Sequence, residues 1–240
     1  MNRKASFNGL ANVIMYLSEE EQLALIDCPK ELKIFAGELV IQIQKNTFFK
    51  PISDNGVPGR FVKVTHSWRK LAAELGYTGP VAWLVKEGFT IGAHAPKTGP
   101  CKENFQYLNN LGIQGDEPTK DSIVFWVPRL VPGSEDKTVS EQTKILTKLR
   151  KQFGLPEHHL SSYGNASLNS GLILTHFKRT GERVPFNGRH IRTDSRFVKG
   201  DNRIHLGDFI VELLCAHHGW NSGRDPMLGC FPLGVELLLD

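Results

Sequence analysis

Two spacings of apolar residues alternate along the chain and predict a mixed fold. Apolar side chains recur at three- and four-residue intervals, the pattern of amphipathic helices, in four segments: 10–45, 68–75, 145–153 and 165–179. The run SIVFWVPRLV is instead apolar on both faces from Ile123 to Val127, as expected of an interior strand. The pattern predicts an α+β protein with a helical N-terminal part, a mixed central region around a buried strand, and a C-terminal antiparallel β-module.

Capping signals mark two of the predicted helix starts. Ser18 is followed by Glu21, and Thr138 by Glu141, and each pair can satisfy two free backbone N–H groups at the start of a helix. The second helix should end at Gly154, since glycine is favoured just past a helix C-terminus.

The remaining segments are predicted from alternation and from turn residues. The alternating RFVKVT at 60–65 and the run PVAWLVKEGFTI at 80–91 indicate strands, and Gly/Pro-rich segments 47–60 and 92–121 indicate irregular chain with one helical turn at 105–111. Beyond Pro185, HIRTDS, NRIHLGDFIVELLC and MLGCFPLGVELLL are separated by turn residues and predict short antiparallel strands. We therefore expect three regions, packed as one or two compact units: 1–58 helical, 59–181 α/β, and 182–240 rich in strands.

Composition and charge narrow the class of protein only slightly. With 40% hydrophobic and 22% charged residues, the 240-residue chain can bury a core. The net charge of +4 permits weak attraction to nucleic acid but is below that of a dedicated basic domain. Four cysteines without a CxxC pair predict reduced, mostly buried thiols. Because no apolar run reaches about 18 residues and the first residues lack a secretory core, we expect no membrane span and a cytoplasmic location.

The segment LCAHHGWNSGRDPMLGCFPLGVE, with the strand before it, holds the residue types of a zinc site. Four side chains offer suitable ligands, within a His/Asp/Cys cluster that spans 205–230: His205, Asp208, His217 and His218. On a strand, however, residues three apart or adjacent point to opposite faces. A zinc-dependent hydrolase or nuclease is therefore one alternative, and histidines that serve only in turns or at the rim are the other.

Other chemical motifs have a simpler structural explanation. His158 and His159 precede Ser161 and Ser162, but no G-x-S-x-G elbow is present, so we expect one of these serines to cap a helix. A nuclease-like cluster is one hypothesis for four aspartates and a basic residue: Asp194, Asp201, Asp208 and Asp225 with Lys199 or Arg203. The aspartates lie among Asn and Gly, where aspartate is a usual turn residue, so turns are the first interpretation. No P-loop or dinucleotide fingerprint occurs.

Basic residues gather on the helix predicted after Thr138. Lys144, Lys148, Arg150 and Lys151 fall toward its C-terminal half, where cations complement the helix dipole, so a solvated face is the first interpretation. The second is DNA binding through residues 139–153 together with 65–78, although no recognition helix follows the latter segment.

A binding face is the remaining possibility. In IHLGDFIVELLC the alternation fails, because too many large apolar groups occur for one face of a strand. Either the strand is buried on both faces, or several groups are exposed beside the aromatic and histidine residues that follow. In the second case the ligand-binding set is His205, Asp208, Phe209, Ile210, Val211, Leu214, His217, His218, Trp220 and Ser222.

The segments RHIRTDS, NRIHLGDF, CAHHGW and LGCFPLGVE, in this order within residues 165–240, resemble the terminal β-module of C-type-lectin-like variable proteins, the targets of diversity-generating retroelements. The chain lacks that family's Gly-Gly-Ser-Trp segment and arginine-rich ending. The resemblance implies a variable, ligand-facing set: Ile204, His205, Asp208, Phe209, Ile210, Val211, Leu214, Ala216, His217, His218 and Ser222. It implies a fixed scaffold of Gly207, Cys215, Trp220, Leu228, Gly229, Phe231, Leu233 and Gly234.

These observations lead to an expected function. We expect a non-enzymatic protein, without a cofactor, that presents residues 204–225 to a protein or other macromolecular ligand. The alternatives are the zinc-dependent hydrolase and, with less support, the DNA-binding protein.

Overall fold

The chain divides into two compact units, residues 1–47 and 48–240. The computed structural model describes 48–102, 117–196, 202–207, 209, 213–220 and 223–238, with the main chain alone at 218–220. The helices expected before residue 47, Cys28 and the turn expected at 105–111 lie outside the described residues.

The first sheet is antiparallel throughout and has the strand order β1-β2-β3-β8. Its strands are β1 (Phe49–Ile52), β2 (Ala82–Val85), β3 (Ser122–Trp126) and β8 (Leu233–Leu237). Every residue of β3 is buried, and β3 lies between β2 and β8, so the prediction of an interior strand here is confirmed.

The second sheet has the order β6-β5-β4-β7. Its strands are β4 (His190–Arg196), β5 (Asn202–Gly207), β6 (Cys215–Trp220) and the short β7 (Leu228–Gly229). β4, β5 and β6 pair antiparallel as expected, whereas β7 runs parallel to β4. The α+β class is therefore confirmed, with a C-terminal module that is antiparallel except at β7.

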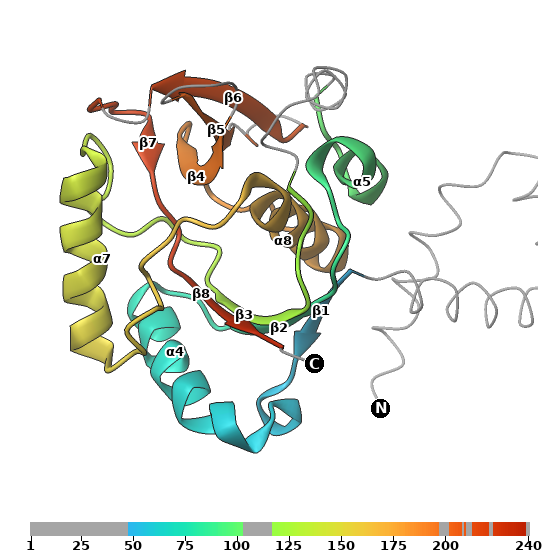
Figure 1. Cartoon of the computed structure of the whole chain (residues 1–240), viewed down its shortest axis with the longest axis vertical. Helices are drawn as coiled ribbons and strands as arrows, with labels where there is room; N and C mark the ends of the chain where they lie inside the picture. The colour runs from blue at the N-terminus through green and yellow to red at the C-terminus, as the bar shows by residue number, and fades with distance from the viewer. Residues whose placement is uncertain are drawn as a thin grey trace, which may run out of the picture. The chain divides into compact units, whose positions relative to one another are not determined.

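Helices separate and cover the two sheets (Figure 1). The long helices are α4 (Val62–Glu74), α5 (Ile91–Thr98), α7 (Val139–Phe153) and α8 (Ala166–Thr180), and two 3-10 turns occupy Asp54–Gly56 and Gly59–Phe61. Alternate residues of the first sheet face two cores: one contains Trp83, Val124 and α8, and the other contains Ala82, Ile123 and the apolar faces of α4 and α7. The second sheet contributes Ile191, Ile204 and Leu206 to the α8 core.

α8 is the central helix of this arrangement. Its residues 166–176 are all buried, since α8 has a sheet on each side. Two of the polar residues among them form hydrogen bonds: Ser167 Oγ accepts from the Ile91 amide, and Asn169 Nδ2 donates to two backbone carbonyls. Asn165 caps the helix by accepting from the Leu168 amide, so the expectation that Ser161 or Ser162 is the cap is wrong.

The predicted strand at 60–65 is instead the start of α4. Phe61, Thr65, Trp68 and Ala72 are buried at helical spacing, while Val62 is 52% exposed. The alternation of Val62 and Val64 therefore reflects one exposed and one half-buried position of a helix, not the two faces of a strand.

Two segments expected to be irregular contain regular structure. β1 lies within the predicted loop 47–60, and α5 extends from Ile91 to Thr98, over the first residues of the predicted irregular stretch 92–121. Pro51 is compatible with a strand because, among the described residues, β1 is at the edge of its sheet and has β2 as its single partner.

The described parts of the three regions expected from the sequence share the unit 48–240. β1, β3 and β8 each come from a different region, yet all lie in the first sheet. Among the described residues, no helix is long and apolar enough to span a membrane.

Candidate functional site: the outer face of the second sheet

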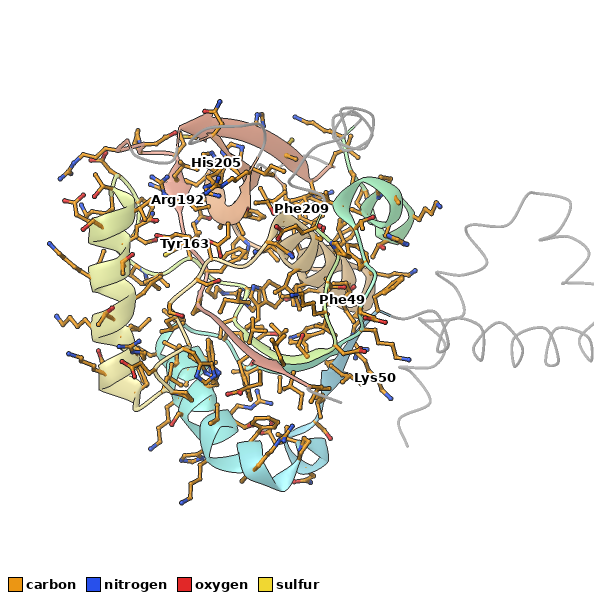
Figure 2. The ribbon with its side chains drawn as sticks, viewed as in Figure 1. Phe49, Lys50, Tyr163, Arg192, His205 and Phe209 are labelled. Carbon is orange, nitrogen blue, oxygen red and sulfur yellow. The ribbon has the colours of Figure 1, made fainter. Side chains whose placement is uncertain are left out.

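The second sheet has an apolar inner face and a polar outer face. Along β4 and β5, Ile191, Ile204 and Leu206 point toward α8, so the residues between them point the other way. The alternation places Arg192 and His205 on the outer face, and Figure 2 shows these two side chains close together.

Backbone register brings three strands' outward residues into one row. Arg192 of β4 is directly opposite His205 of β5, and His205 is directly opposite His217 of β6. Directly opposed residues have Cβ atoms about 5 Å apart, so the three side chains are neighbours. We call this row, with His190, the histidine face.

His190 joins the histidine face diagonally. Its ring centroid is 4.6 Å from that of His217, with the rings nearly perpendicular. The ring lies against Gly207, where an added Cβ would come within 2.8 Å of His190 Cδ2 and closer still to the backbone of 189–190. Gly207 is therefore the residue that lets His190 approach β6.

Part of the histidine face is covered. Arg192 Nη2 donates to the carbonyls of Lys137 at 3.1 Å and of Gly223 at 3.0 Å, which ties the segments around these residues over the sheet. Arg192 is only 1% exposed and His205 only 4%, whereas His217 is exposed. The face thus runs from a buried cation to an imidazole at the surface.

His205 is the unusual member of the histidine face. Its Nε2 is buried and has no hydrogen-bond partner within the described part of the chain. Burial, and then the Arg192 charge and the His190 imidazole, lower the pKa of His205 to about 4, while Asp225 opposes this shift. The imidazole is therefore neutral at neutral pH, and its Nε2 is a buried polar atom without a partner among the described residues.

Several residues expected to bind a ligand are buried instead. Phe209 is 3% exposed and packs edge-on against Phe177 of α8 at 5.2 Å, and Leu214 is fully buried in the α8 core. His205, also expected to be exposed, is buried on the outer face. Phe209 and Leu214 are therefore buried in the α8 core, but not as parts of a strand buried on both faces, because both lie outside β5 and β6.

The other expected residues are only partly covered by the structure. Asp208, Ile210, Val211 and Ser222 lie outside the described residues. His218 and Trp220 belong to β6, where only the main chain is described. Of the expected zinc ligands His205, Asp208, His217 and His218, the structure therefore shows two side chains next to each other, those of His205 and His217.

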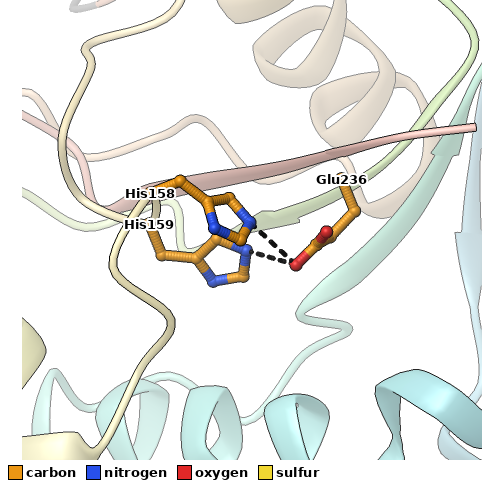
Figure 3. Close-up of side chains that lie close together, drawn as sticks. All are labelled: His158, His159 and Glu236. Carbon is orange, nitrogen blue, oxygen red and sulfur yellow. Dashed lines mark hydrogen bonds and ion pairs between the residues drawn. The ribbon is translucent and has the colours of Figure 1, made fainter.

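The described residues hold one compact group of possible metal ligands, and it lies elsewhere: His158, His159 and Glu236. Both imidazole Nε2 atoms are 3.0 Å from Glu236 Oε1 (Figure 3). His158 is exposed, His159 is completely buried, and Gly234 permits the close approach because an added Cβ would lie 2.7 Å from the His159 ring.

The hydrogen bonds of His159 argue against a metal in this group. Trp68 Nε1 donates to His159 Nδ1 at 3.0 Å, and an indole N–H is a donor only. Nδ1 is therefore unprotonated, and the neutral ring carries its proton on Nε2, which donates to Glu236. A metal bound at Nε2 requires the opposite tautomer, with the proton on Nδ1. We infer a hydrogen-bond chain that joins α4, the 158–159 turn and β8.

This assignment predicts a spectroscopic result. In long-range ¹H–¹⁵N spectra at neutral pH, His159 should show a pyrrole-like Nε2 and a pyridine-like Nδ1, because burial, with the His158 imidazole beside it, lowers the pKa of His159 to about 4. Addition of Zn²⁺ should leave this pattern unchanged. A switch to protonated Nδ1 with zinc would show that the group is a metal site after all.

The remaining aspartates and cysteines have structural roles or are buried. Asp194 accepts hydrogen bonds from Ser162 Oγ at 2.7 Å and the Tyr163 amide, and Asp225 accepts from the Met227 amide. Asp225 matches the turn interpretation, whereas Asp194 lies in β4 and accepts from the neighbouring 162–163 segment. Asp201, Asp208 and Lys199 lie outside the described residues. Cys101, Cys215 and Cys230 are free thiols, and the latter two are buried.

Sequence reasoning missed His190 and Arg192. The signal was present in HIRTDS, where His190 and Arg192 alternate with Ile191 and Thr193 and therefore share a strand face. What the alternation does not provide is the register with β5 and β6. No family model, curated protein or solved structure matches this chain.

Proposed function

We propose that the protein is a binding protein whose ligand contacts the histidine face, and that the group bound there is an oxyanion, a carboxylate or a phosphate, of a small molecule or of a protein. The observation that carries the proposal is the buried, unpartnered Nε2 of His205 within a row that ends at an exposed imidazole. A buried polar atom without a partner costs about 1–3 kcal/mol, which a ligand can recover.

The chemistry of the row favours an oxyanion. Arg192 is a permanent cation, and the imidazoles of His190, His205 and His217 contribute N–H groups beside it. The proposed function belongs to the class expected from the sequence, a binding protein whose binding face lies on the C-terminal sheet. The proposed face differs from the expected one: it consists of the outward residues of β4, β5 and β6 and does not include Phe209 and Leu214. The proposal assigns no reaction.

A titration of the histidine side chains tests the proposal. Inorganic phosphate and citrate, added at constant ionic strength, should produce saturable shifts of the ¹H–¹³C signals of His205 and His217. The His217→Ala variant should bind about 3- to 10-fold more weakly, as expected for one lost hydrogen bond.

His66 provides the matched control. It is an exposed histidine of α4, far along the chain from the second sheet, so its signal should not move and His66→Ala should bind normally. Equal linear shifts at His66 and His217, or no saturable shift with either anion, would contradict the proposal.

The zinc-dependent hydrolase remains a weaker candidate. Only His205 and His217 of its expected ligands are shown together, and the compact group at Glu236 has the wrong tautomer for a metal. Stoichiometric zinc that is lost in His217→Ala would favour the hydrolase over the binding protein.

A further inference from the structure

α7 carries a stripe of lysines on its exposed side. Lys144, Lys148 and Lys151 follow one another at i, i+4 and i+7, so they share one face of the helix, and with Thr143 and Thr147 they line a shallow surface depression. The opposite side of α7 packs through Leu146 and its apolar neighbours against the core shared with α4. We call these five residues the lysine stripe.

The helix dipole explains only part of this charge. Its effect is confined to the last turn, which contains Arg150 and Lys151, whereas Lys144 and Lys148 lie further toward the N-terminus. Like charges at i, i+4 cost a helix about 0.2–0.5 kcal/mol per pair. None of the three lysines forms an ion pair within the described residues, so nothing shown there offsets the repulsion.

We propose that the lysine stripe binds the phosphate backbone of a nucleic acid, without reading its sequence. All five residues come from one helix, so the depression has a single wall and does not enclose a small ligand. The helix bears four basic residues and one acidic residue, a formal +3 in a chain whose net charge is +4. α7 is thus an exposed element with a clear excess of positive charge.

Two features favour nucleic acid over an acidic protein. The exposed large apolar residues of the described chain are Val62, Leu213, Met227 and Leu237, and none lies on α7, although protein interfaces usually contain apolar or aromatic anchors. The hydroxyls of Thr143 and Thr147 beside the lysines are typical phosphate contacts. At 1.5 Å per residue the three lysines span about 10 Å, enough to contact several phosphates of one strand.

Fluorescence anisotropy with labelled duplex DNA, and with duplex RNA of equal length, tests the proposal. The intact protein should bind at low salt, and the logarithm of its affinity should fall linearly with the logarithm of salt concentration. In the variant Lys144→Glu/Lys148→Glu/Lys151→Glu, affinity should fall at least about 10-fold and the salt slope by about 3, close to one unit per lost phosphate contact. The two arms show whether DNA, RNA or both are bound.

The control changes the net charge equally at another place. Lys63, Lys70 and Lys86 are exposed and lie on α4 and just after β2, so Lys63→Glu/Lys70→Glu/Lys86→Glu should retain most of the affinity. If both variants lost the same affinity for the duplex, binding would depend on the net charge of the protein and not on the lysine stripe, and the proposal would be wrong. No binding to either duplex, or binding of polyglutamate through the lysine stripe in place of nucleic acid, would also overturn the proposal. The lysine-stripe variant should still show the saturable shift of the His217 signal with inorganic phosphate, which separates this test from that of the histidine face.

Discussion

Replacement of Gly171 by alanine should destabilise the protein by about 2 kcal/mol, although alanine favours a helix by about 1 kcal/mol over glycine. Gly171 lies within α8, and an added Cβ would be 2.0 Å from the ring of Phe49. That ring is 1% exposed and is held edge-on against Phe89 at 4.9 Å, so it has no room to retreat. The midpoint of urea unfolding should fall at constant m-value.

Two variants make the cause of this loss measurable. Gly59→Ala, where an added Cβ meets nothing within 4 Å, should change stability by less than about 0.5 kcal/mol. Phe49→Leu combined with Gly171→Ala should lose less than the two single variants together, because the smaller side chain admits the methyl group. Additive losses would mean that the ring of Phe49 is not the obstacle.

Acidification from about pH 7 to about pH 5 should lower the free energy of unfolding by roughly 4 kcal/mol, through His159 and His205 together. Burial is the main cause that lowers the pKa of each histidine to about 4. At His159 the neighbouring His158 lowers the pKa further, and Glu236 opposes this. At His205 the charge of Arg192 and the imidazole of His190 lower the pKa further, and Asp225 opposes this. In the unfolded chain a histidine takes up its proton below about pH 6.5, so the native advantage is complete above that pH and is lost as the pH falls toward about 4.

Urea unfolding at several pH values between these limits measures the effect. His205→Gln should remove about half of the acid dependence, since the other buried imidazole remains. His66→Gln, which alters an exposed residue of α4, should retain all of it. A stability that is flat from pH 7 to pH 5 in the intact protein would mean that both imidazoles can be protonated without opening the fold.

Local signals in the sequence were sufficient for some elements. The capping box of Thr138 and Glu141 and the left-handed Gly154 bound α7 as predicted, because both act within a few residues of the chain. The interior strand was also predictable, since a run buried on both faces needs no partner to be recognised. By contrast, α4 was mistaken for a strand at Val62 and Val64, where one turn of a helix and a short alternation cannot be told apart.

The candidate site depended on information that a single sequence does not contain. His205 and His217 were singled out for their chemistry, but which residues join them is decided by pairing between strands that are distant in the chain, including the irregular β4–β5 register. The burial of Phe209 and Leu214 likewise depends on α8, whose two buried sides could not be inferred from a helical stripe of Leu168, Leu172 and Ile173. The sequence therefore identified histidines suited to a binding site, but the strand pairing and helix packing determine which residues surround them.

The position of β8 beside β3 also affects how the protein can be made. All of α7, α8 and the second sheet lie between these two strands in the chain, so their contact is of high sequence separation and should form late and slowly. Until β8 has left the ribosome, the apolar edge of β3 has no partner and can pair with another nascent chain. β8, which follows all the other described strands in the chain, is therefore the strand that protects β3 from aggregation.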